Sequence, residues 1–293
     1  MSVVPPVVLT IAGFDPSSGA GITADVKTIA AHECYGISCI TALTVQSTQG
    51  VRRVKGVDPK LIAETLQELV SDLAVRAVHI GMLGNSQAVE VVAEFLLHAF
   101  PDKARLPHIV LDPILKSSSG ADLLDVAGTR LLLDRLLPLV ELITPNLAEA
   151  SVLTGLPVTN LDQMRAAAIS LHALGAANVV VTGGHLDKEK AIDLLSFATS
   201  RGTETETFKA DRQRSNSTHG TGCAFATAVA CHLAHGRGLP EAVLLAKAYV
   251  SAAIANAHPL GHGVGPVHHL YRMSQQRRPS TVVSEAEPAH SRN

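Results

Sequence analysis

The stretch VVLTIAGFDPSSGAGITAD, Val7–Asp25, places an apolar run, a glycine-rich loop and the start of a helix in direct succession. The run Val7–Ala12 is apolar throughout, which is typical of a strand buried on both faces of a sheet. Glycines that follow such a strand let the backbone turn sharply and approach a ligand closely. The stretch therefore predicts a strand–loop–helix unit, and similar apolar runs follow at Ile37–Val45, Ala77–Gly81, His108–Asp112, Val140–Thr144 and Asn178–Thr182.

Helix-like segments alternate with these apolar runs. Pro59 follows Asp58, which is the pattern of an N-cap and a proline in the first helical position. Asn85 and Asn160 are further N-cap candidates, and the last of these helices is expected to stop at Gly175. Strand–helix alternation predicts an α/β fold, a three-layer αβα sandwich whose mostly parallel central sheet carries helices on both faces.

The pattern changes after the sixth apolar run. Ala191–Phe197 and Thr203–Ala210 predict a small hairpin at the sheet edge, and two Ala-rich helices are expected at Cys223–His235 and Pro240–Ala257.

Length and composition limit the classes of function. The 293 residues are 46% hydrophobic, enough for one large domain, which we expect over residues 1–273. Residues 274–293 are polar and without periodicity, so we expect a disordered tail. A formal net charge of −2 argues against a nucleic-acid surface, and no apolar run is long enough for a membrane span. Four cysteines without a C-x-x-C pair and no signal-peptide pattern indicate the cytoplasm.

Ligands of parallel α/β sheets bind at the carboxyl ends of the strands, and the polar motifs of this sequence follow strands. The loop within Gly13–Asp25 nearly fits a dinucleotide fingerprint from Gly19 onward. Extra residues precede Gly19, however, and no acidic residue that could hold a ribose occurs between Glu33 and Asp58. The sequence therefore favours a small-molecule loop over a dinucleotide site.

Further polar residues follow other strands. Gln46 carries an amide donor and acceptor that could pair with an aminopyrimidine edge, or it could simply be solvated. Asp112 ends a strand. Asn146 and Glu149 share one helix face, either as a capping box or as a magnesium and phosphate site. The glycines after Thr182 form either a turn or a nucleotide contact.

The loop Gly220, Thr221, Gly222 and Cys223 precedes an apolar helix. The first N–H groups of a helix lack intrahelical acceptors and the helix dipole is positive there, so this loop predicts an anion hole. It is no Walker A loop, because the lysine is missing. A thiol at such a position is expected to ionise readily and could accept a proton. The alternative is that Cys223 only fills space in the first turn.

Taken in order, these motifs resemble the hydroxymethylpyrimidine/phosphomethylpyrimidine kinases of thiamine biosynthesis, a family with the ribokinase-like fold. The resemblance covers about residues 7–272. It rests on TIAGFDPSSGAGITADVKT, YGISCITALTVQSTQGV, IGMLG, VLDP, LITPNLAEA, GGH, HGTGCAFATAVA, AKAYVSAAI and GVGPVHH.

The resemblance implies ATP-dependent phosphorylation of 4-amino-5-hydroxymethyl-2-methylpyrimidine and then of its monophosphate. The residues implied to line the pyrimidine pocket are Gly13, Asp25, Gln46, Met82 and Ile114. Those implied on the nucleotide side are Asp112, Asn146, Glu149, Thr182 and Gly184, with Glu149 holding Mg²⁺. Cys223 would be the catalytic base, and Gly220, Thr221 and Gly222 the anion hole.

The sequence departs from the family pattern in places. Thr182 stands where the family often has lysine, and Lys116 is a candidate for the missing charge. Residues 216–218 read Asn-Ser-Thr instead of the usual Lys-Asn-Thr. Two alternatives remain: a pyridoxal or pyridoxine kinase on the same fold, and a non-catalytic pyrimidine-binding sensor. The expected partners are the pyrimidine, ATP and a second copy of the chain, since the family is commonly dimeric.

Overall fold

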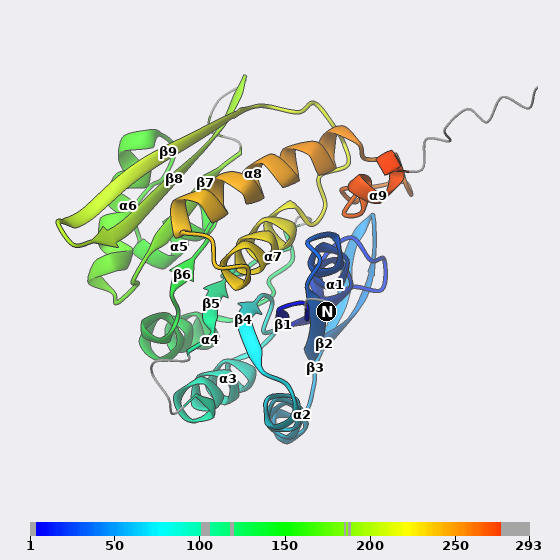
Figure 1. Cartoon of the computed structure of the whole chain (residues 1–293), viewed down its shortest axis with the longest axis vertical. Coiled ribbons are helices and arrows are strands. Elements are labelled where there is room, and N and C mark those ends of the chain that lie inside the picture. The colour runs from blue at the N-terminus through cyan, green and yellow to red at the C-terminus, as the bar shows by residue number, and fades with distance from the viewer. Residues whose placement is uncertain (1–3, 101–105, 118–119, 185, 187–188, 277–293) are drawn as a thin grey trace, which may run out of the picture.

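The computed structural model describes residues 4–100, 106–117, 120–184, 186 and 189–276, and in this part of the chain the strands form one nine-stranded sheet (Figure 1). The strands are β1 Val7–Phe14, β2 Tyr35–Ser47, β3 Gly50–Gly56, β4 Val75–Ile80, β5 His108–Leu111, β6 Leu142–Ile143, β7 Val179–Gly183, β8 Lys190–Thr199 and β9 Gly202–Asp211. Their order is β3-β2-β1-β4-β5-β6-β7-β8-β9, parallel from β2 to β7 and antiparallel at both edges.

Helices cover both faces of this sheet. They are α1 Gly21–Ala31, α2 Pro59–Asp72, α3 Ser86–Ala99, α4 Val126–Leu131, α5 Leu147–Thr154, α6 Leu161–Ala173, α7 Thr221–Ala234, α8 Leu239–Ala255 and α9 Tyr271–Gln276. A π-helical turn, Leu132–Leu136, and a 3₁₀ turn, Leu137–Leu139, continue α4.

Two apolar cores separate the sheet from its helices. One core lies beneath α2, α3, α5 and α6 and includes Leu66, Val92 and Leu171. The other lies beneath α1, α7 and α8 and includes Val229 and Val243. The three-layer αβα fold with a mostly parallel sheet is therefore confirmed.

The helix starts follow the expected capping chemistry. Asp58 Oδ1 accepts from the N–H of Lys60 at 2.9 Å, and Asn85 and Asn160 cap α3 and α6 in the same way. Each cap satisfies an N–H group that has no partner inside its helix. The predicted hairpin is also present, as β8 and β9.

The edge strand β3 was not predicted. Its sequence, GVRRVKG, is charged and largely polar, as an exposed edge strand can be, and so it lacks the apolar signal of the central strands. Pairing with β3 prolongs β2 through Gln46, which faces Val51 across a bulge after Val45. Gln46 therefore lies within a strand and not, as predicted, in the turn after one. A bulge re-aims the side chains next to it.

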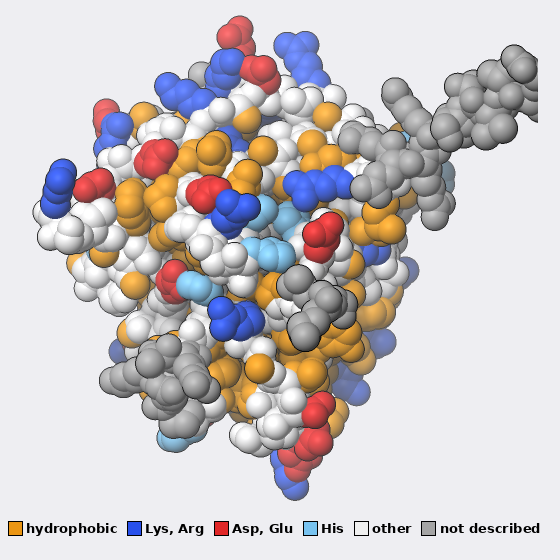
Figure 2. All heavy atoms as spheres, in the orientation of Figure 1, with side chains coloured by type: hydrophobic (Ala, Val, Ile, Leu, Met, Phe, Trp, Pro, Cys, Tyr) orange, Lys and Arg blue, Asp and Glu red, His pale blue; other side chains and the backbone are white. Residues whose placement is uncertain are grey.

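The surface carries charges of both signs. Figure 2 shows acidic and basic side chains scattered over the face it presents, without a large region of one sign. Among the helices in the described ranges, none combines the length and apolar character needed to cross a membrane. Helix α9 includes residues 274–276, the first part of the predicted tail, and the remainder of that tail lies outside the described residues.

Candidate active site

Two glycine-rich segments meet at the carboxyl end of the sheet. Gly220 is the N-cap of α7 and has φ +84°, a left-handed conformation that favours glycine. A Cβ atom at Gly220 would overlap the carbonyl oxygen of Gly19, and one at Gly21 would overlap that of Gly13. The loop after β1 and the loop before α7 are thus packed backbone to backbone, and only glycine fits at the contact.

The first turn of α7 lies where the sequence predicts an anion hole. The N–H groups of Gly222 and Cys223 have no acceptor within the helix, because they belong to its first turn. A Cβ atom at Gly222 would lie 3.4 Å from Asp112 Oδ2, so the helix start faces the end of β5. The structure therefore brings Gly220, Thr221, Gly222 and Asp112 together.

Cys223 lies next to this loop, but its thiol does not have the low pKa that was expected. It is 7% exposed. Burial, together with the charges of Asp25, Asp112 and Glu149, raises its pKa well above the ordinary value, and a hydrogen bond from the Gly21 N–H offsets only part of this. The expectation of an easily ionised thiol at the helix start is therefore wrong, because burial and nearby carboxylates outweigh the helix dipole.

Asp112 and Glu149 form a buried pair of carboxyl groups. Burial and the charge of Glu149 raise the pKa of Asp112 well above its usual range. Burial also raises the pKa of Glu149 to about 7, although N–H groups of Asn146 and Leu115 donate to it. Asn146 and Glu149 form a complete capping box at α5, so the structural interpretation of that pair is confirmed. Because burial raises the pKa of Glu149, a negative charge in this capping box is energetically costly.

The strand end at Thr182 lies beside the capping box. Thr182 pairs with Asn146 in a parallel bridge, and its N–H donates to the Pro145 carbonyl at 2.9 Å. Gly184 follows in an exposed turn, with open space where a Cβ would be. The histidine of the GGH motif lies outside the described residues. Lys116 Nζ lies 2.5 Å from Asp122 Oδ1, so its charge is paired.

Three of the residues expected to line a pyrimidine pocket lie close together in the structure. Met82 is buried, and its sulfur lies 3.0 Å from the position of a Cβ at Gly13. Ile114 packs against the same small apolar cluster, which includes Met82.

Asp25 was expected to line the pyrimidine pocket, but the structure places it elsewhere. Its side chain is fully buried, and its carboxylate accepts from Thr10 Oγ1 at 2.7 Å and Thr227 Oγ1 at 3.0 Å. His79 Nδ1 lies 3.4 Å from the same carboxylate. Both oxygens are occupied by protein groups, so Asp25 braces α1, α7 and β1 and offers no free edge to a ligand.

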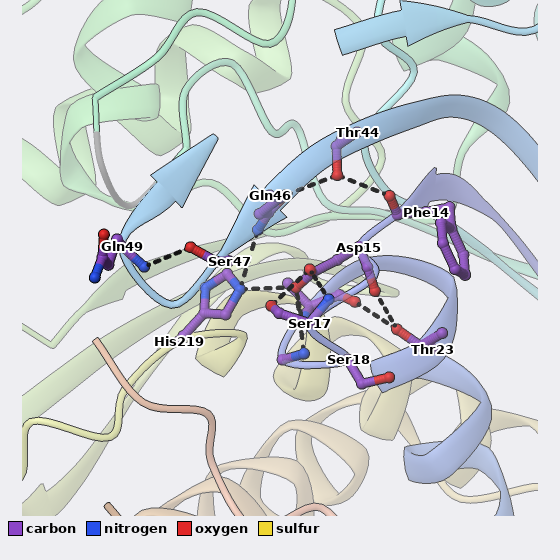
Figure 3. A network of polar contacts seen from close by, with 12 residues as sticks. Phe14, Asp15, Ser17, Ser18, Thr23, Thr44, Gln46, Ser47, Gln49 and His219 are labelled. Atoms are coloured by element: carbon purple, nitrogen blue, oxygen red, sulfur yellow. Dashed lines mark hydrogen bonds and ion pairs between the residues drawn. The ribbon is translucent and has the colours of Figure 1, made fainter. Parts of the chain in front are cut away.

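Gln46 belongs to a polar network that sequence reasoning missed (Figure 3). His219 Nε2 lies 3.2 Å from Gln46 Nε2 and 2.9 Å from Asp15 Oδ2. Gln46 and His219 also line a cavity of about 130 Å³, together with Val51 and Ser117. His219 stands in the HGTGC motif and Asp15 in GFDPSSGAG. Their place in these motifs was the only available signal, since the two residues are 204 positions apart.

A second buried ion pair was also not foreseen. Lys247 Nζ lies 2.6 Å from Asp193 Oδ2, and Asp193 Oδ1 accepts from the N–H of Gly183 at 3.0 Å. This pair ties α8 to the strand end at β7.

Residues 258–266, here named the C-terminal strap, join the two walls of the cavity. The Val264 N–H donates to the Thr48 carbonyl in the turn between β2 and β3. The Gly265 carbonyl accepts from the N–H of His219, and the Gly265 N–H donates to the Asn216 carbonyl. The strap thus connects the β2–β3 turn with the loop before α7.

Comparisons with known proteins agree with this arrangement. The family model described as phosphomethylpyrimidine kinase matches residues 15–268. The chain is 42% identical over 266 residues to hydroxymethylpyrimidine/phosphomethylpyrimidine kinase of Escherichia coli, covering 90% of this chain and 97% of that protein. It is 43% identical over 263 residues to thiamine biosynthesis bifunctional protein ThiED of Geobacter sulfurreducens, covering 90% of this chain but spanning only 52% of that relative's length.

Solved structures give the same fold. The ADP complex of Bacillus subtilis pyridoxal kinase has a TM-score of 0.81 and 34% identity to this chain, with 92% of this chain and 99% of that one covered. The ribokinase-like fold expected from the motifs is confirmed. With most of its length matched by one family model, the chain belongs to the phosphomethylpyrimidine kinase family.

Proposed function

We propose that this protein transfers the γ-phosphate of ATP to the hydroxymethyl group of 4-amino-5-hydroxymethyl-2-methylpyrimidine, and then phosphorylates the monophosphate to the diphosphate. This activity would serve thiamine biosynthesis. The observation that carries the proposal is the start of α7, where free N–H groups and Cys223 adjoin Asp112 in a chain of this family.

The pyrimidine would bind between the loop after β1 and the β2–β3 hairpin. Met82, Gly13 and Ile114 provide an apolar surface, and Gln46 borders the adjoining cavity. The chain has no tryptophan and only 3% aromatic residues, so aliphatic groups and amides would hold the ring. In this proposal Asp25 supports the pocket from behind.

The phosphoryl group would lie at the start of α7, with the triphosphate extending toward Asn146, Thr182 and Gly184. Catalysis of phosphoryl transfer consists mainly of positioning and charge stabilisation, which preorganised N–H groups provide.

Asp112 and Glu149 fit a magnesium ion. Within the described residues, no cluster of three or more His, Cys, Asp or Glu side chains could hold a metal by itself. Magnesium commonly uses only one or two carboxylates and takes its other ligands from water and phosphate. Burial raises the pKa of both carboxyl groups, and the charge of Glu149 adds to the rise at Asp112; a bound cation would stabilise the charged forms of both. A cation there would also offset carboxylate charge that keeps the Cys223 thiol protonated.

Cys223 would accept the proton of the substrate hydroxyl. Its sulfur already accepts a hydrogen bond from the Gly21 N–H, a contact that favours the thiolate. The raised pKa implies that the thiol stays protonated in the free protein and becomes a base only once positive charge is nearby.

A phosphate-product assay with Mg-ATP tests the proposal directly. We expect phosphate transfer to both the pyrimidine alcohol and its monophosphate, and a strongly raised KM for the pyrimidine in Gln46→Leu. Gln67→Leu, an exposed glutamine of α2 away from this cavity, is the matched control. Absence of any phosphorylated pyrimidine, with a folded protein, would remove the proposed function.

Pyridoxal kinase activity is the second candidate, favoured by the structural similarity to the Bacillus subtilis pyridoxal kinase. Parallel assays with pyridoxal, pyridoxine and the pyrimidine rank the two activities by kcat/KM. A sensor without catalysis would bind the pyrimidine but consume no ATP.

We also propose that the protein is a cytoplasmic homodimer. Tyr35, Leu43 and Val45 of β2 are apolar and exposed, which suits contact with a second copy. Light scattering of the purified chain measures its mass, and a monomer at all concentrations would contradict this part of the proposal.

A further inference from the structure

The network at His219 contains a conflict between hydrogen-bond donors (Figure 3). Asp15 Oδ2 and Gln46 Nε2 both lie within hydrogen-bond distance of the same ring nitrogen, at 2.9 Å and 3.2 Å. A ring nitrogen either carries a proton, and donates, or lacks one, and accepts. It cannot donate to the carboxylate of Asp15 and accept from the amide nitrogen of Gln46 at the same time.

Asp15 decides the state of this nitrogen. Its two oxygens already accept from the hydroxyl and N–H of Ser17 and from the N–H groups of Gly19 and Ala20. Burial would raise the pKa of Asp15, but hydrogen bonds from His219, Ser17 and Ala20 lower it below its ordinary value, so the group is an anion. An anionic oxygen 2.9 Å from a ring nitrogen requires an N–H there. His219 Nε2 therefore carries a proton.

Thr44, at the other end of the Gln46 amide, independently indicates which way the amide is turned. Its hydroxyl oxygen lies 2.9 Å from the Phe14 carbonyl oxygen and 3.1 Å from Gln46 Oε1. A hydroxyl has one hydrogen, and both of these oxygens can only accept. If the shorter contact, to Phe14, takes the hydrogen, the atom of Gln46 beside Thr44 must be a donor. The amide nitrogen meets that requirement and the amide oxygen does not.

We propose that the Gln46 amide lies with its oxygen toward His219 and its nitrogen toward Thr44, and that Asp15 and His219 are positioning residues that fix this orientation. An amide's two ends have nearly the same shape, so hydrogen bonding alone selects between them. This orientation removes the donor–donor contact, because the single Nε2–H is then shared between the Asp15 carboxylate at 2.9 Å and the Gln46 amide oxygen at 3.2 Å as a three-centre hydrogen bond. The imidazole ring packs directly against Gly19, where a Cβ would overlap it, so the Gly19 backbone blocks movement of the ring to that side.

The fixed orientation of the Gln46 amide determines which hydrogen-bond donor and acceptor face a ligand in the cavity. One N–H of Gln46 is left after the contact to Thr44, and the amide oxygen keeps a second lone pair. These groups complement a ring-nitrogen acceptor next to an amino donor, which is the edge of a 4-aminopyrimidine. A 4-oxo ring presents the reverse pattern, and to bind it the amide would have to turn its N–H groups against His219. Asp15 and His219 would thus select amino over oxo pyrimidines, an inference that rests on the proposed contact of Gln46 with the substrate.

The test compares the 4-amino alcohol with its 4-oxo analogue as substrates. The ratio of kcat/KM for the amino alcohol to that for the oxo analogue should fall about 10-fold to 100-fold in Asp15→Asn and in His219→Asn. In these variants the Gln46 amide can turn to bind the oxo ring without placing its N–H groups against the N–H of His219. The change should lie mainly in KM. Thr44→Val should lower the ratio and Thr44→Ser should preserve it. Equal losses toward both substrates, with an unchanged ratio, would mean a merely structural role and overturn the inference.

A second measurement does not depend on activity. Nitrogen-15 NMR of the wild-type protein with labelled histidine reports which ring nitrogen is protonated, and His219→Asn identifies the signal. We expect a protonated Nε2 at neutral pH. An unprotonated Nε2 overturns the inference even if the enzyme is active. Conversely, a protonated Nε2 in a protein that phosphorylates neither pyrimidine would refute the proposed function and leave the amide orientation standing.

Discussion

Replacing Glu149 with glutamine should change how the stability of this protein depends on pH. The amide oxygen of glutamine can still accept the hydrogen bond that Glu149 receives from the Asn146 N–H, so the capping box is kept. What is lost is a buried acid whose pKa is raised from 4.5 to about 7. The comparison therefore isolates the cost of burying a negative charge at this position.

The sign and size follow from proton linkage. Between about pH 4.5 and about pH 7 the folded protein holds a proton on Glu149 that the unfolded chain has released. Stability must therefore fall as the pH rises through this range, and the full penalty persists above it. The difference between the two pKa values corresponds to about 3 kcal/mol. Glu149 is only 8% exposed, so solvent screening removes little of this penalty.

Urea unfolding at about pH 5 and about pH 8, without divalent cations, measures the effect. Part of the penalty is already present at about pH 5, so we expect wild type to lose about 2.5 kcal/mol more than Glu149→Gln over this interval. Added Mg²⁺ should restore wild type at the higher pH and have little effect on the variant. Parallel pH profiles for the two proteins would refute the reasoning, because they would show that Glu149 titrates alike in the folded and unfolded states.

Other variants test the remaining parts of the site. Cys223→Ala should lower kcat by about 100-fold or more while pyrimidine affinity, measured by calorimetry, stays within a few-fold, and full turnover would remove the role as base. Gly220→Ala should lower both activity and melting temperature, because there is no space for its Cβ atom. The control is Gly155→Ala, where the backbone is also left-handed but no atom lies near the Cβ position, and this variant should cost only about 1 kcal/mol of stability. Equal losses in the two variants would contradict the packing argument. Lys247→Met should destabilise the fold by about 3–5 kcal/mol in urea. Adding Asp193→Asn, which removes the charge but keeps an oxygen for the Gly183 N–H, should restore most of that stability. A single variant as stable as wild type would show that the ion pair is dispensable.

The features that follow from local sequence could be predicted. Buried parallel strands are continuous apolar runs, and Asp58 and Asn85 are caps because of their own side-chain chemistry. The strand β3 could not be recognised in this way, because an edge strand needs no apolar face and GVRRVKG has little of one. Pairing with β3 then moved Gln46 from the expected turn into β2.

Burial and long-range pairing could not be predicted from the same patterns. Asp25 follows a glycine-rich loop, where a ligand contact is reasonable, yet Thr10 and Thr227 from two other elements enclose its carboxylate. Cys223 begins a helix, where a low pKa is expected, but the depth of the site reverses the shift. The pairing of Asp15 with His219 depends on how two distant loops fold against each other, which no local motif specifies.

The C-terminal strap determines how short a working version of this protein can be. Every residue proposed for chemistry or recognition precedes Gly261, so a gene truncated at that codon would still encode the complete set. The shortened product would nevertheless lack the segment that hydrogen-bonds Thr48 on one side and His219 on the other. The minimal catalytic unit therefore includes a stretch whose contacts with Thr48 and His219 are made by its backbone, and designers of fusions or truncations should place their boundary beyond it.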